Sequence, residues 1–359
     1  MRTREESIEL IKAYCDANGV SGFEEEVAAL GQKENQAVCD TKIDFLRNLY
    51  LNLKTNKGDR PKVWLDAHSD EVGFIVQAIR PNGTLEFLPL GGWDPNNVPA
   101  SKVRVQNADG EWISGIVASK PVHYMTAGEK GRALDFSDMT IDVGAVSAED
   151  LKENFHIRMA APVVPDVTCT YDEGRDLFLG KAMDCRVGCA VLTETMNRLS
   201  KESLDVDVVG TLSVQEEVGE RGSMAAVQNI DADIAIIFEG CPADDTFSPE
   251  YRIQSGLKRG PMLRHFDKSM ITNPRFQRYA LDLAEKKEIP VQEAVRAGGG
   301  TNAKYIHTSR FGVPTIVIGV PVRFTHSSHC FCTLEDYEHA VRLATELVKS
   351  LNVDVISRF

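Results

Sequence analysis

The chain has 359 residues, of which 43% are hydrophobic and 26% charged, and its formal net charge is −13. A chain of this length is longer than a single hydrophobic core usually organises, so we expect two domains, one of which can be inserted in the other. The negative charge argues against nucleic acid and anionic membrane surfaces as partners, and the apolar runs are too short to span a membrane.

The first segments of the chain are predicted to be helical. Residues 5–34 fit two helices joined by a turn at 19–22, where Ser21 precedes an acidic first turn, a pattern typical of a helix start. Strands are expected around 42–55 and 62–67. The charged N-terminus does not resemble a signal peptide, and the eight cysteines lack the spacing of a secreted disulfide framework. We therefore expect reduced thiols and a cytoplasmic location.

From 72 to 165 the sequence changes character. Short alternating segments are interrupted by Gly, Pro, Asn and Asp, and the first helix expected there lies at about 148–154. Turn signals at this spacing predict a small β domain.

After residue 175, helical and strand patterns alternate, which predicts an α/β fold with a mostly parallel central sheet flanked by helices. The expected helices cover 185–202, 220–229, 273–287, 302–311 and 333–351, and the expected strands cover 205–214, 232–238, 289–295 and 314–319.

Two motifs carry most of the chemical information. His68 and Asp70 follow the apolar run Val63-Trp-Leu, and the adjacent acids Glu216 and Glu217 follow another short apolar segment. Neighbouring carboxylates that are partly buried are costly unless a positive charge neutralises them, and a metal ion is a common remedy.

Three further candidates, Asp184, Glu239 and His326, lie in similar positions. Each has an ordinary structural explanation, such as a helix cap or an acid at a strand end. Together they are more informative, because ligands gather at the carboxyl ends of parallel strands. Carboxylates and imidazoles suit zinc, cobalt and manganese. Paired ions lower the pKa of a water molecule bound to them, and a carboxylate that binds no metal can accept the proton of that water.

Five blocks of the chain resemble the glutamyl aminopeptidase and deblocking aminopeptidase family, which consists of cocatalytic dizinc metallopeptidases that assemble into tetrahedral dodecamers. The blocks are Gly19-Val-Ser-Gly-Phe-Glu-Glu-Glu26, His68-Ser-Asp-Glu-Val-Gly-Phe74, Gln215-Glu-Glu-Val-Gly-Glu-Arg-Gly222, Gly299-Gly-Thr-Asn-Ala303 and Pro321-Val-Arg-Phe-Thr-His-Ser327. Their order along the chain matches the family pattern.

The resemblance implies a ligand set for two divalent ions, most often zinc, with cobalt or manganese as alternatives. Asp184 would bridge the ions, His68 and Glu239 would complete one, and Glu217 and His326 the other. Glu216 would be the general base, and Asp70 would orient the imidazole of His68.

The resemblance also implies a division into domains and a set of partners. Residues 1–71 and 166–359 would form the catalytic domain, and 72–165 an inserted β-barrel or PDZ-like domain for dimerisation. The enzyme would remove N-terminal residues from short peptides as a homo-oligomer, with dimers assembling to a dodecamer.

Three positions depart from the family pattern, because Glu239, Cys185 and Asn302 stand where relatives carry Asp. By analogy we expect a cis peptide bond between Asp184 and Cys185, with the Cys185 thiol as a small apolar filler and not a metal ligand.

Two alternatives remain open. The same metal centre would serve an N-acyl amino-acid deacylase. Alternatively, a structural zinc on His326, His329, Cys330 and Cys332 would make the protein a scaffold, although these residues are spaced too closely to wrap one ion easily. An inactive homologue is disfavoured, because each expected ligand position holds a metal-competent side chain.

Overall fold

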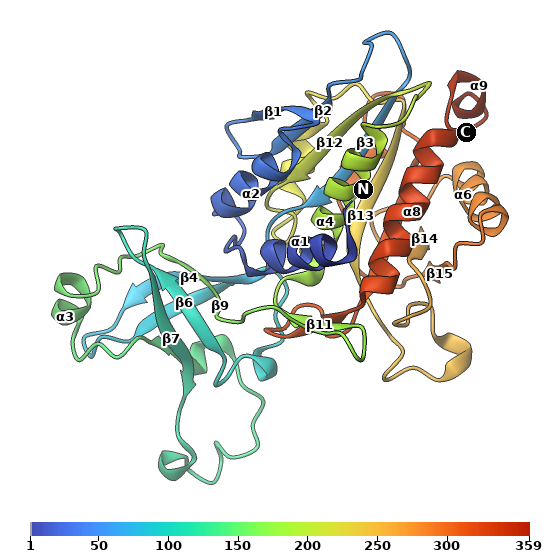
Figure 1. Ribbon diagram of the computed structural model, residues 1–359. Helices are drawn as coiled ribbons and strands as arrows, with labels where there is room; N and C mark the ends of the chain where they lie inside the picture. Colours follow the sequence, from blue (N-terminus) through green and yellow to red (C-terminus); the bar gives the residue numbers. More distant parts are fainter. Residues whose placement is uncertain (1) are drawn as a thin grey trace.

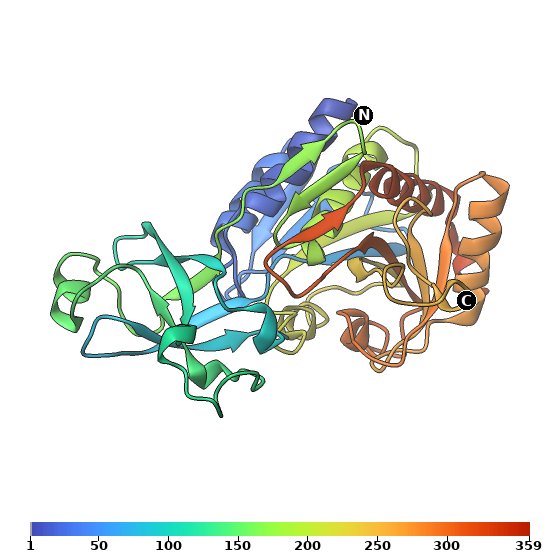
Figure 2. The ribbon, with the colours of Figure 1, turned by 90° about the horizontal axis from the view of Figure 1, so that it is seen from below.

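The computed structural model describes residues 2–359 and shows two parts, a helix-covered sheet and a barrel that projects from one side of it (Figures 1 and 2). Both ends of the chain lie on the part that contains the large sheet. Among residues 2–359, no helix is both long and apolar enough to cross a membrane.

The central sheet has eight strands. In spatial order they are β1 (Cys39–Ile43), β2 (Leu49–Leu53), β12 (Asp207–Ser213), β3 (Lys62–His68), β13 (Ile234–Pro242), β16 (Thr315–Val322), β14 (Met262–Phe266) and β15 (Gln292–Val295). The four strands from β12 to β16 run parallel, so their carboxyl ends meet at one edge of the sheet. Strand β14 pairs antiparallel with β16.

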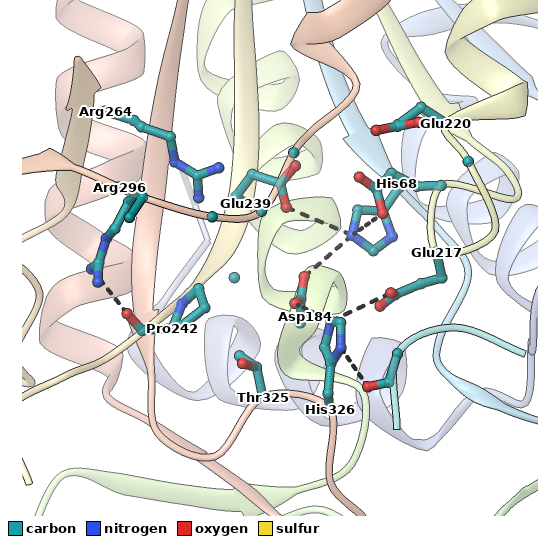
Figure 3. A pocket seen from close by; sticks show the side chains of 18 residues that line it. His68, Asp184, Glu217, Glu220, Glu239, Pro242, Arg264, Arg296, Thr325 and His326 are labelled. Atoms are coloured by element: carbon teal, nitrogen blue, oxygen red, sulfur yellow. Dashed lines mark hydrogen bonds and ion pairs between the residues drawn. The ribbon is translucent and has the colours of Figure 1, made fainter. Parts of the chain in front are cut away.

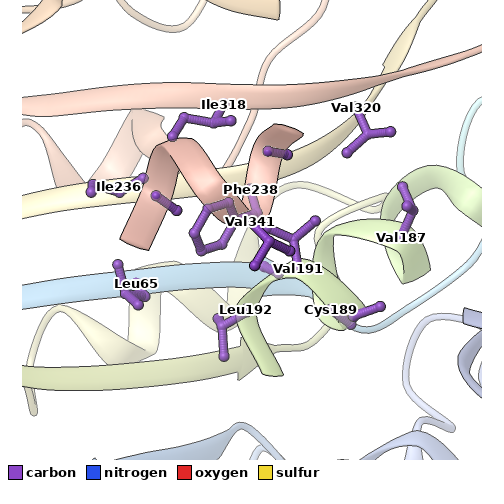
Figure 4. Close-up of a cluster of buried hydrophobic side chains, with 14 of the residues drawn as sticks. Leu65, Val187, Cys189, Val191, Leu192, Ile236, Phe238, Ile318, Val320 and Val341 are labelled. Atoms are coloured by element: carbon purple, nitrogen blue, oxygen red, sulfur yellow. The ribbon is translucent and has the colours of Figure 1, made fainter. Parts of the chain in front are cut away.

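Helices bury both faces of this sheet, so its inner strands are apolar on both sides. In β3, Val63 and Leu65 face the larger core, whereas Trp64 faces the smaller one. Figure 4 shows the larger core, where Leu65 and Phe238 lie near side chains of α4 and α8. The helices are α1 (Arg4–Asp16), α2 (Glu25–Asn35), α4 (Met183–Leu199), α5 (Arg221–Ala226), α6 (Pro274–Lys286), α7 (Ala303–Ile306), α8 (Leu334–Ser350) and α9 (Val353–Ile356).

The second part is a closed antiparallel barrel with its own core. In spatial order its strands are β4 (Gly73–Ile79), β5 (Leu85–Leu90), β8 (Met139–Asp142), β7 (Trp112–Ser119), β6 (Lys102–Gln106) and β9 (Pro162–Pro165), and α3 (Ala148–Glu153) packs beside them. Phe74 and Phe87 are buried at its centre, with their ring centroids 4.9 Å apart.

A third, small sheet lies beside α4. Its strands are β10 (Thr170–Asp172), β11 (Leu177–Gly180) and β17 (Cys330–Cys332), and Gly180 of β11 is opposite Cys330 of β17. A Cβ on Gly180 would lie 2.9 Å from Cys169 Sγ, so the thiol occupies the space that a side chain would need.

The predicted fold class is confirmed, although some local predictions differ. Strand β14 was not expected, and α7 is shorter than the helix predicted over 302–311. The prediction that Ser21 starts a helix was wrong in its details. α2 begins at Glu25, and the Ser21 hydroxyl donates to Asp70 Oδ2 at 2.6 Å.

Candidate metal centre

A cavity of about 790 Å³ opens at the carboxyl edge of the central sheet (Figure 3). The predicted ligands project into it from five segments. His68 ends β3, Glu239 lies in β13, Asp184 is the second residue of α4, Glu217 follows β12, and His326 follows β16. Each lies at or near the carboxyl end of a parallel strand or in the first turn of α4, as expected for an α/β fold.

Asp184 lies between the two histidines. Its Oδ1 is 3.2 Å from His68 Nε2, and its Oδ2 is 3.5 Å from His326 Nε2. The two oxygens of one carboxylate thus face two different imidazoles, which is the arrangement a bridging ligand needs. The peptide bond between Asp184 and Cys185 is cis, which confirms the prediction.

Each histidine has a second acid beside it. Glu239 Oε2 is 3.6 Å from His68 Nε2, and Glu217 Oε2 is 3.4 Å from His326 Nε2. Glu216 Oε2 is more distant, at 4.0 Å from His68 Nε2. The side chains therefore form two groups that share Asp184, with Glu216 at their margin.

Two buried carboxylates hold the turn that carries the glutamate pair. Asp70 accepts the backbone N–H groups of Glu216 at 2.9 Å and Glu217 at 3.1 Å, and Glu24 accepts that of Gln215 at 3.0 Å. Asp70 Oδ1 is also 3.4 Å from His68 Nδ1. Asp70 therefore touches the backbone of the glutamate pair as well as the ring of His68.

Burial changes the acidity of the site. It raises the pKa of Glu217 to about 7, that of Glu239 to about 8, and that of Glu216 well above its usual range. Burial also raises the pKa of Asp184, but contacts with His326 and then His68 outweigh it and hold that pKa below its usual range. Four carboxylates around two imidazoles favour the binding of cations.

The donor set fits divalent metal ions. Three groups can each converge on one ion with ligand atoms within 4.8 Å of one another, and they are His68 with Cys185 and Glu239, His68 with Glu216 and Glu217, and Asp184 with Glu217 and His326. Glu217 Oε1 is buried and has no hydrogen-bond partner among residues 2–359. An uncompensated buried carboxylate oxygen is costly, and an ion would satisfy it.

Cys185 lies next to this set. Its Sγ donates to Phe238 O at 3.2 Å, and burial raises the pKa of the thiol well above its usual range. The sulfur also lies within 4.8 Å of the ligand atoms of His68 and Glu239. That Cys185 binds no metal therefore stays a prediction.

Two kinds of cavity residue were not predicted from the sequence. Gly92, in the loop after barrel strand β5, accepts a hydrogen bond from His326 Nδ1 at 2.7 Å. Arg264 and Arg296 line the wall beyond Glu239 (Figure 3). No motif marked these positions, since Gly92 lies in a turn signal and Arg264 lies in the strand that was not expected.

The alternative zinc site is not assembled. Cys330 Sγ points to Phe324 O at 3.4 Å, and His329 Nδ1 contacts Ser328 Oγ at 3.0 Å. Within the described chain, His329, Cys330 and Cys332 belong to none of the groups whose ligand atoms converge, and His326 converges with Asp184 and Glu217 instead.

Comparisons with known proteins find similarity over most of the chain. A family model described as M42 glutamyl aminopeptidase matches residues 48–343. The lysyl aminopeptidase of Pyrococcus furiosus is 31% identical over 356 residues, which cover 96% of this chain and 97% of that protein.

Solved structures are similar along nearly their whole length. A TET aminopeptidase from a marine sediment archaeon of the Thaumarchaeota superposes with a TM-score of 0.94 at 35% identity, covering 98% of this chain and 99% of that one. The TET1 peptidase of Pyrococcus horikoshii, described as able to assemble into a tetrahedron or a large octahedral shell, has a TM-score of 0.86 at 26% identity. That match covers 96% of this chain and 100% of the other.

Proposed function

Because this chain belongs to the M42 glutamyl aminopeptidase family and is a metal-dependent aminopeptidase, we propose that its cavity binds two divalent ions. Asp184 would bridge them, with His68 and Glu239 completing one site and Glu217 and His326 the other. The observation that carries this proposal is the division of the two Asp184 oxygens between the two histidines.

Two further acids, Glu216 and Asp70, have proposed roles beside the metal ligands. When bound, paired divalent ions polarise a carbonyl oxygen and lower the pKa of water. Glu216 would accept the proton of the attacking water and pass it to the leaving amine, since its side chain lies at the edge of both ligand groups. Asp70 would hold the glutamate turn and the ring of His68.

Zinc is the proposed ion, with cobalt and manganese as alternatives, because the donors are imidazole nitrogens and carboxylate oxygens. The test uses metal-stripped protein to which each ion is restored in turn, with metal content and hydrolysis of aminoacyl anilides both measured. We expect chelation to abolish activity and two ions per chain to restore it. Full activity in demonstrably metal-free protein would contradict the proposal. An N-acetylated anilide should resist cleavage, whereas a deacylase would accept it.

We further propose short peptides with an acidic first residue as preferred substrates. Arg264 and Arg296 line the cavity, and the Nε atom of each is buried without a hydrogen-bond partner in the described chain. Asp267 and Asp244 neutralise part of their charge, at 2.9 and 3.1 Å. A free carboxylate on the substrate would add a second negative charge beside these guanidinium groups.

Glutamyl and lysyl anilides compared at equal concentration test this preference. We expect a higher kcat/KM for the glutamyl substrate, and Arg264→Gln should reduce the ratio. One relative is named a lysyl aminopeptidase, and a lysyl preference of this chain would overturn the proposal.

We also propose that residues 72–165 form an inserted domain that joins copies of the chain into a dodecamer. Large apolar side chains are exposed on the barrel, among them Tyr124, Val146 and Met159. The Pyrococcus horikoshii relative, described as able to assemble into a tetrahedron or a large octahedral shell, supports the assembly of many copies. Light scattering should give a mass of many subunits, and a stable, active monomer would refute the proposed assembly.

All eight cysteines are free and buried, which supports the proposal of a reducing, cytoplasmic location.

A further inference from the structure

The loop of residues 91–93 leaves barrel strand β5 and reaches the catalytic cavity. It contacts side chains proposed to bind one ion, whereas His68 and Glu239 extend from strands of the central sheet. We infer that this loop positions the ligands of the ion held by Glu217 and His326, so that the barrel sets the affinity of one metal site and not of the other. The inference rests on the proposed pair of ions.

The first step is the hydrogen bond to His326. Its Nδ1 donates to Gly92 O at 2.7 Å, which fixes the proton on that nitrogen. The lone pair of Nε2 is then free, and this atom lies 3.4 Å from Glu217 Oε2 and 3.5 Å from Asp184 Oδ2. A backbone carbonyl from the barrel thus selects the tautomer that can bind a metal.

The second step is the close approach of the two glycines. A Cβ on Gly92 would lie 3.0 Å from His326 Nδ1, and a Cβ on Gly91 would lie 3.2 Å from Glu217 Cβ and 2.5 Å from Val72 Cγ1. The loop therefore packs directly against both side chains of the second site, and a larger residue would displace them.

The third step is the attachment of the loop to the barrel. The Trp93 ring stacks on Phe74, with centroids 5.0 Å apart and planes 24° apart. Phe74 is 1% exposed at the centre of the barrel core. A shift of the barrel against the catalytic domain would consequently move Gly92 O away from His326.

The experiment compares Gly92→Ala with the control Gly128→Ala. The backbone of neither glycine has a positive φ, and a Cβ on Gly128 meets no atom within 4 Å. Cobalt(II) is titrated into each metal-stripped full-length protein, and visible absorption and bound metal are followed. Because loss of an outer partner of a metal ligand costs about 10–100-fold in affinity, we expect Gly92→Ala to weaken one of two binding steps by that factor. The other step, and both steps of the control, should match the wild type.

Trp93→Leu provides a second variant, since it removes the stack on Phe74 without adding an atom near His326. It should weaken the same binding step, and it decides the question if Gly92→Ala does not fold. Wild-type affinities at both steps, or equal weakening of both, would overturn the inference. If the wild type itself binds a single ion, the proposed function fails instead.

Discussion

Replacing Glu216 by Gln would remove a proton acceptor while leaving its surroundings intact. The backbone N–H of residue 216 would still donate to Asp70, and Gln has nearly the same volume as Glu. Loss of a general base typically lowers the rate by about 10²–10⁴-fold, which corresponds to about 3–5 kcal/mol in the activation free energy. We therefore expect Glu216→Gln to keep its metal ions and lose its turnover.

Glu217→Gln is the matched comparison on the adjacent residue. Glu217 Oε2 lies 3.4 Å from His326 Nε2, and its Oε1 has no hydrogen-bond partner within residues 2–359. A neutral amide at this position removes one negative charge from the second site. Loss of a residue that only hydrogen-bonds a metal ligand lowers metal affinity by about 10–100-fold. Because Glu217 is itself a proposed ligand, its loss should weaken binding of the ion at the second site by more than that.

The assay separates the two effects. Both variants are stripped, reloaded with zinc at a fixed free concentration, and examined for ions per chain and for kcat on an aminoacyl anilide. Glu216→Gln should retain two ions, and Glu217→Gln should retain one. Equal loss of metal from the two variants would refute the assignment of roles, as would a turnover of Glu216→Gln close to that of the wild type.

Two further predictions concern buried polar groups near the site. Burial, together with the charge of Asp70, raises the pKa of Glu24 to about 8. Since the folded state then binds this proton more tightly than the unfolded chain, the free energy of unfolding should fall as pH rises from about 5 to about 8. Chemical denaturation of Glu24→Gln should show a smaller fall, and an identical pH profile would contradict this. Asn302 Nδ2 donates to Asp66 Oδ2 at 2.8 Å. Asn302→Asp would therefore place a second buried carboxylate next to that of Asp66. Its denaturation midpoint should drop more at pH 8 than at pH 5, and a pH-independent drop would exclude charge repulsion.

Much of the candidate site could be predicted because its residues follow strands of an α/β sheet. His68 and Glu239 lie on neighbouring parallel strands, in which Ile237 is paired with Asp66. Each of the two site residues follows its paired residue by two positions, so both reach the carboxyl edge of the sheet side by side. Sequence periodicity predicts such strands, and the fold class then brings their ends together. The departure at Asn302 also has a physical reason, because its amide pairs with the buried carboxylate of Asp66.

The remaining site residues depend on contacts that no local pattern specifies. Gly92 and His326 are 234 positions apart, and a Gly-Gly pair predicts a turn without indicating what approaches it. Arg264 lies in a short strand that also contains a histidine. Its burial depends on Asp267 and on Cys241 Sγ, which accepts from it at 3.1 Å. The five residues show no strict alternation of apolar and polar side chains, so the strand has no clear sequence pattern.

The small sheet beside α4 controls a distance inside the cavity. Gly180 ends β11 shortly before Asp184, and Cys330, its partner in β17, follows His326 by four residues. A slip of one residue in this pairing would shift the strands by about 3.4 Å, as much as the 3.5 Å that separates His326 Nε2 from Asp184 Oδ2. The register of a strand pair outside the active site therefore determines whether a carboxylate and an imidazole remain within reach of the same ion.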